Sequence, residues 1–154
     1  MSRDDRSTCI SAGHLHTELP KNNMEKVTKK HIGYPGSTRK PGALASAVRC
    51  GQWIYVSGQG PLDMATKQYL PGTIEEETAM TLTHIENILR EAGASKAAVV
   101  KCTCYLSDLN DFAGFHKTFQ EFFGDPLPSR TTVGAPLLRG IRVEIDAVAF
   151  VDEE

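Results

Sequence analysis

The feature that most constrains this fold is a pair of helical segments, each apolar along one side only. The first is predicted over residues 74–92, and phenylalanines repeat every three or four residues from 112 to 122 in the second. Helices of this kind need a single sheet to cover. The apolar stripe of the first helix consists of Leu82, Ile85, Leu89 and Ala92.

Both helices have recognisable starts. Thr73 and Glu76 form a capping box before the first helix, and Gly93 is a natural stop after it. The second helix is predicted to start at a cap supplied by Asp108 or Asn110.

The remaining segments predict strands. We expect an edge strand over 25–32, a β-hairpin over 44–60, a strand over 97–108 and a final hairpin within 129–150. This order predicts an α+β fold, with a single mixed sheet of six strands and both helices on one face.

The last predicted strand indicates a role for the face of the sheet that the helices leave uncovered. Apolar side chains at 143, 145, 147 and 149 alternate with a second set that mixes charge and large apolar groups. The first set suits the helix side. The second set is typical of an oligomer interface or a lined cleft, so we predict self-association through that face.

Length and charge set further bounds. The 154 residues are enough for one domain, which we assign to 24–154 after an N-terminal tail, 1–23, that lacks the apolar stretch of a signal peptide. A net charge of −2 does not favour a nucleic-acid or membrane partner. No address signal is readable, so the cytoplasm is the default expectation.

The cysteines and histidines do not predict a metal site. Cys102 and Cys104 alternate along a predicted strand and point to one face, where we expect buried small side chains. His14 and His16 could bind a metal, but no second pair of ligands stands near them in the sequence.

Arg130 and Glu144 are the candidate chemical groups. Arg130 follows "LPS" at the start of a predicted strand and shares a face with Thr132, where a guanidinium and a backbone N–H could bind a small carboxylate. Glu144, expected on the adjacent strand, could accept a proton or orient a water molecule. A purely structural cross-strand pair between the two is an equal alternative.

Four segments together resemble the Rid/YjgF family of reactive-intermediate (enamine/imine) deaminases over residues 25–151. They are "WIYVSGQGPLD", "CYLSDLNDFAGFHKTFQEFFG", "LPSRTTV" and "VEIDAVA". The resemblance implies a chorismate-mutase-like fold, a homotrimer and three clefts between subunits. It also implies hydrolysis of 2-imino or 2-enamino acids to 2-oxo acids and ammonia, with no metal or cofactor.

The resemblance assigns roles to individual residues. Arg130 would bind the substrate carboxylate with help from the backbone amide of Thr132, and Glu144 would hold or activate water. Gly58, with Ser57 beside it, would line the cleft.

Two positions depart from the family pattern. Leu44 stands where many imine-active members have a tyrosine, and His116 stands where an asparagine is common. His116 is either a pocket residue or an exposed surface histidine.

Leu44 favours a second hypothesis, a non-catalytic trimer that binds a small carboxylate. A chaperone-like or translation-affecting role ranks last, because no basic patch or aromatic platform supports RNA binding.

Overall fold

The structure is a computed structural model that describes residues 28–36, 44–64 and 66–152. The predicted tail, with His14 and His16, lies outside these residues, as do positions 25–27 of the first predicted strand.

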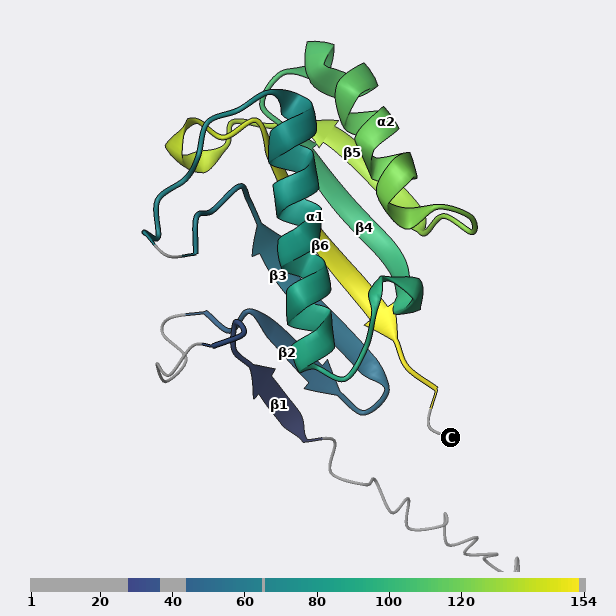
Figure 1. Ribbon diagram of the computed structural model, residues 1–154. Helices are drawn as coiled ribbons and strands as arrows, with labels where there is room; N and C mark the ends of the chain where they lie inside the picture. The colour runs from purple at the N-terminus through teal and green to yellow at the C-terminus, as the bar shows by residue number, and fades with distance from the viewer. Residues whose placement is uncertain (1–27, 37–43, 65, 153–154) are drawn as a thin grey trace, which may run out of the picture.

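All six strands belong to one sheet, whose spatial order is β1-β2-β3-β6-β4-β5 (Figure 1). Neighbouring strands are antiparallel except for β4 and β5, which are parallel. The strands are β1 Lys29–Ile32, β2 Ala47–Cys50, β3 Trp53–Gln59, β4 Val99–Leu106, β5 Ser129–Gly134 and β6 Val143–Phe150.

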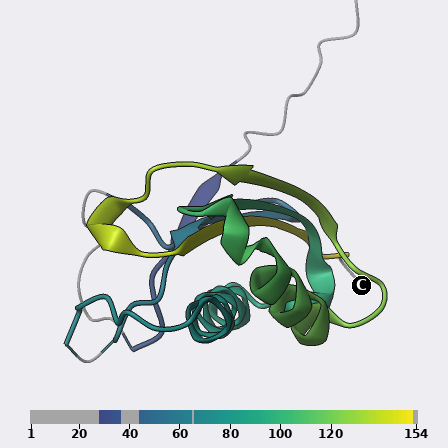
Figure 2. The ribbon, with the colours of Figure 1, turned by 90° about the horizontal axis from the view of Figure 1, so that it is seen from above.

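Two helices, α1 Ile74–Glu91 and α2 Phe112–Phe123, lie side by side against one face of this sheet (Figure 2). The α+β architecture predicted from the sequence is therefore confirmed. Short 3-10 turns precede β4, α2 and β6, at Lys96–Ala98, Leu109–Asp111 and Leu138–Gly140.

The caps of the helices follow the local sequence. Thr73 accepts a hydrogen bond from the Glu76 amide, and Glu76 accepts one from the Thr73 amide, which completes the capping box. Asp108 accepts from the Asn110 amide and so caps the 3-10 turn that leads into α2.

The predicted final hairpin is wrong. β5 and β6 are not neighbours, because β4 lies between them and pairs with both. Burial explains this arrangement. One side of β6 is fully apolar and buried. In the middle of the sheet this side is removed from water most completely, whereas the more polar β5 lies at the edge.

The core fills the space between the helices and the sheet. Phe115 and Phe119 of α2 and the α1 stripe pack against the buried side of the strands, as predicted from the spacing. Phe112, by contrast, is 41% exposed. The buried residues of β6 are Val143, Ile145, Ala147 and Ala149.

The opposite face of the sheet, called here the open face, has neither helix against it. Trp53 and Tyr55 of β3 are 42% and 50% exposed, and Trp53 meets Phe150 of β6 edge-on at 4.9 Å between ring centroids. Glu144 lies on the same face, so the predicted mixture of charge and large apolar groups is present there.

Candidate functional site

Glu144 projects from β6 onto the open face and lies over Gly58 of β3. A Cβ at position 58 would overlap Oε1 of Glu144, so the carboxylate can occupy this position only if residue 58 is glycine. On the other side, Glu144 is in register with Tyr105 of β4. The close approach of Gly58 explains why a glycine stands inside a strand at this point.

Two hollows in the surface share Gly58. The first, called the Leu138 hollow, has a volume of about 410 Å³ and is lined by Tyr105, Glu144, Asp146 and the segment 135–138. The second, called the Leu44 hollow, has a volume of about 210 Å³ and includes Ser57, Leu62 and Tyr69.

Each hollow contains a hydroxyl group, that of Tyr105 in the Leu138 hollow and that of Ser57 in the Leu44 hollow. Burial and the neighbouring Asp146 carboxylate raise the pKa of Tyr105, so its phenol stays protonated at neutral pH. The Ser57 hydroxyl donates a hydrogen bond of 2.8 Å to the carbonyl of Ala45 and thus anchors the segment next to Leu44.

Arg130 lies on the other side of the sheet, under α2. Its guanidinium carbon is 4.7 Å from the ring centroid of Phe119, 5.1 Å from Phe115 and 5.7 Å from Phe112. Aromatic faces attract a cation without neutralising it. Arg130 forms no ion pair with any residue that the structure describes, so its charge remains available to an anion.

His116 is a direct neighbour of Arg130, so a fully exposed surface histidine is the wrong alternative. Arg130 Nη2 donates to His116 Nδ1 at 3.1 Å, and the imidazole is stacked on the Phe112 ring at 5.5 Å. Because Nδ1 accepts from a guanidinium, the proton of the neutral ring lies on Nε2. His116 therefore holds the arginine in place.

Thr132 lies two residues beyond Arg130 and is half-buried like it, while Thr131 between them is exposed. The predicted shared face is thus confirmed. The Thr132 hydroxyl oxygen is buried and has no hydrogen-bond partner among the described residues. An unpaired buried hydroxyl is costly, and a ligand beside Arg130 could satisfy it.

Arg130 and Glu144 do not meet within one chain. Arg130 packs against α2, whereas Glu144 lies on the open face, and strand β4 separates the strands that bear them. The expectation that Glu144 lies on the strand adjacent to Arg130 is therefore wrong, and the two residues form no cross-strand pair. Within one chain, Arg130 and Glu144 therefore face different sides of the sheet.

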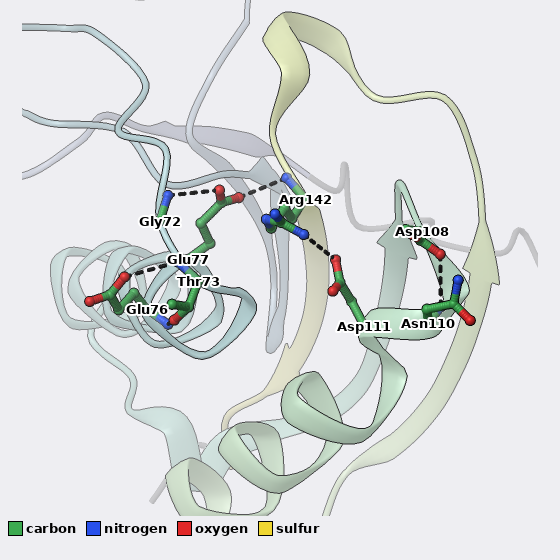
Figure 3. Close-up of polar contacts among 8 residues, drawn as sticks. All are labelled: Gly72, Thr73, Glu76, Glu77, Asp108, Asn110, Asp111 and Arg142. Carbon is green, nitrogen blue, oxygen red and sulfur yellow. Dashed lines mark hydrogen bonds and ion pairs between the residues drawn. The ribbon is translucent and has the colours of Figure 1, made fainter.

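A buried carboxylate, Glu77 of α1, positions the strand that bears Glu144 (Figure 3). Glu77 is 2% exposed and accepts from the amide of Arg142 at 2.7 Å and from that of Gly72 at 3.2 Å. The Arg142 side chain forms an ion pair with Asp111 at 2.9 Å (Figure 3). These contacts tie the start of β6 to both helices.

In the sequence, Glu77 is one of three consecutive glutamates in the first turn of α1, where the helix dipole alone accounts for acidic residues. The signal that could have found it is its spacing: Glu77 is eight residues before Ile85 and so lies on the apolar stripe. A charge on that stripe indicates a buried carboxylate with fixed partners.

The two strand cysteines are buried parts of the core, as expected. Burial raises the pKa of Cys102 to about 12, and burial also raises the pKa of Cys104. Neither thiol is a ready nucleophile.

Among the described residues, no group of three or more histidine, cysteine or acidic side chains is placed to hold a metal ion. None of the helices in the described part of the chain is both long and apolar enough to cross a bilayer.

The comparison with protein families shows to which family the chain belongs. The family model described as Endoribonuclease L-PSP matches residues 38–151. The chain belongs to this family, which is also called Rid/YjgF.

Similar Rid/YjgF proteins cover most of the chain. A RutC family protein of Pyrococcus abyssi is 38% identical over 123 residues, which are 79% of this chain and 97% of that protein. The 2-iminobutanoate/2-iminopropanoate deaminase of Bos taurus is 36% identical over 127 residues, 82% of this chain and 93% of that enzyme.

Solved structures agree with the fold. The YjgF gene product of E. coli superposes with a TM-score of 0.72 at 29% identity, over 79% of this chain and 98% of that one. E. coli TdcF, solved with bound serine, gives 0.70 at 28% identity, over 80% and 99%.

Proposed function

We propose that this Rid/YjgF protein is a hydrolytic deaminase that converts 2-imino or 2-enamino acids into 2-oxo acids and ammonia. Arg130 would bind the substrate carboxylate, and Glu144 of a neighbouring copy would orient the attacking water. The observation that carries the proposal is the guanidinium held between α2 aromatic rings and His116 with no anionic partner among the described residues.

The proposed reaction needs no strong nucleophile from the protein. A protonated imine is already electrophilic, and water adds to its C2 to give a carbinolamine. Glu144 takes a proton from the water and returns it to the nitrogen, and then takes the hydroxyl proton as the C–N bond breaks. The 2-oxo acid remains, and the ammonia leaves with that last proton as ammonium. Holding the carboxylate and the water together lowers the entropic part of the barrier, and the reaction balances with water as the only co-reactant.

The remaining site residues complete this proposal. The backbone amide of Thr132 would be a second donor to the carboxylate, and His116 would hold Arg130 in place and contact the substrate. Gly58 and Ser57 would line the cleft beside Glu144. The relatives named as imine deaminases support this class of reaction, and TdcF with bound serine shows that a relative takes up an amino acid.

We further propose that the assembly is a homotrimer with its clefts between subunits, joined through the open face. The exposed aromatic side chains on that face and the placement of Arg130 and Glu144 on opposite sides of the sheet support this assembly. The proposed compartment is the cytoplasm, although a Schizosaccharomyces pombe relative of 38% identity is named as mitochondrial. Light scattering should give three times the mass of one chain.

The test of activity is a competition assay. An amino-acid oxidase with catalase generates the imino acid, semicarbazide traps it, and the protein is added to divert it to the 2-oxo acid. We expect wild type to lower the semicarbazone signal, Arg130→Ala to have no effect, and the exposed-arginine control Arg90→Ala to behave as wild type. No loss of signal with wild type would instead favour the non-catalytic carboxylate-binding role that Leu44 suggests. An equal loss with wild type and Arg130→Ala would indicate another mechanism.

A further inference from the structure

Two highly exposed leucines line the two hollows that share Gly58. Among the large apolar residues that the structure describes, Leu44 and Leu138 are the most exposed, at 83% and 79%, and Leu109 follows at 60%. Leu44 lines the Leu44 hollow and Leu138 lines the Leu138 hollow. Both hollows share Gly58, so the two leucines flank the position over which the Glu144 carboxylate lies.

The Leu138 hollow has both a polar and an apolar lining. Tyr105, Glu144 and Asp146 supply its polar lining, and the run 135–138, Ala-Pro-Leu-Leu, supplies its apolar lining. Such a hollow fits a molecule with a polar reacting end and an apolar tail, because each part then meets a lining of its own kind.

The apolar lining is held in place. Arg139, directly after Leu138, has a φ of 60° and lies over the Tyr69 ring at 5.5 Å from the ring centroid. Tyr69 belongs to the Leu44 hollow, so this contact joins the walls of the two hollows. Leu138 is therefore presented by an anchored turn.

We propose that these leucines select imino acids with branched aliphatic or aromatic side chains over those with a methyl group. This inference rests on the proposed function and names its substrate class. A methyl group would leave Leu138 in contact with water, whereas an isobutyl or benzyl group would cover it. Each methylene withdrawn from water raises kcat/KM by up to about fourfold, so three further carbons, partly covered, give about tenfold.

The experiment compares imines generated from alanine, 2-aminobutyrate, leucine and phenylalanine by an amino-acid oxidase. We expect kcat/KM for the leucine-derived imine to exceed that for the alanine-derived imine by about tenfold. Leu138→Ala and Leu44→Ala should each lower this ratio about threefold or more. The control Leu127→Ala, an exposed leucine that lines neither hollow, should keep it.

Equal rates for both imines, or a ratio that Leu138→Ala does not change, would overturn the inference while leaving the deaminase activity intact. The leucines could instead pack against a second copy of the chain. Leu138→Ala would then lower the mass of the assembly in light scattering at an unchanged ratio, which also overturns the inference.

Binding of the products separates this inference from the proposed function. Calorimetry with 4-methyl-2-oxopentanoate and pyruvate measures the same side-chain preference without turnover. Tighter binding of the branched 2-oxo acid, weakened by Leu138→Ala, supports the apolar preference even if no imine is hydrolysed. Equal affinity in a protein that turns over no imine contradicts both proposals.

Discussion

The guanidinium of Arg130 and the carboxylate of Glu144 lie on opposite faces of one sheet, with strand β4 between the strands that bear them. If both act on one substrate, each site combines the arginine of one subunit with the glutamate of another.

Mixing two inactive variants should therefore restore activity. Arg130→Ala and Glu144→Gln chains, each inactive alone, are co-expressed with different tags, and the mixed assembly is purified. In a mixed trimer, one of the three sites pairs an intact arginine with an intact glutamate, so about one third of the wild-type rate should return. A mixed assembly as inactive as its parents would contradict a site shared between chains.

Gly58→Ala should impair turnover and leave the fold intact. The new Cβ overlaps Glu144 Oε1, which lies at the end of a flexible side chain, so the carboxylate moves and the strand stays. Misplacing the group that orients water should lower kcat about 100-fold. Gly33→Ala is the matched control, because a Cβ there meets nothing within 4 Å.

Removing the His116 ring should weaken substrate binding. His116→Ala takes away the acceptor that holds Arg130 Nη2, and a hydrogen bond from a charged donor is worth about 1.5 kcal/mol. We expect KM to rise about tenfold with a smaller change in kcat. His116→Asn, which can still accept, should recover part of the loss; no recovery would point to the lost stacking on Phe112.

Glu77→Ala should destabilise the protein. The substitution leaves the amides of Gly72 and Arg142 without their acceptor, at a cost of about 2–3 kcal/mol in the free energy of unfolding. Urea unfolding measures this loss. Glu91→Ala, which removes an exposed carboxylate of the same helix, should change stability little.

His84 should make stability depend on pH. Its Nε2 donates to the Leu62 carbonyl at 2.7 Å and its Nδ1 accepts from the Tyr34 hydroxyl at 2.8 Å. Burial, opposed by the Leu62 hydrogen bond, lowers the pKa of His84 below its ordinary value of 6.5. The native state then binds fewer protons than the unfolded chain, so the free energy of unfolding falls as the pH drops below about 6.5.

The check is a series of urea unfolding curves between pH 7.5 and 5. The decline due to His84 should level off once the pH passes below its native pKa. The variant His84→Gln should show a flatter profile over this range. Identical slopes for the variant and wild type would show that other groups dominate.

The sequence by itself determined the local features of this protein. Helical spacing and the Thr73–Glu76 capping box located α1, and the repeat of phenylalanines located α2. Alternation predicted which side of β6 is buried, and short motifs around Arg130 and Glu144 indicated the family. These signals are readable because each depends on residues that are close together in the chain.

The tertiary structure alone decided which strands pair and which groups meet. β6 lies between β3 and β4 because a strand with one fully buried apolar side buries most surface when it has a neighbour on each edge. The turn before β6 does not encode this position. The strand order places β4 between the strands of Arg130 and Glu144, and the packing of α2 on β5 places His116 beside Arg130. The hydrogen bond from the Arg142 amide to Glu77 also depends on the tertiary structure, because this donor lies far away in the sequence.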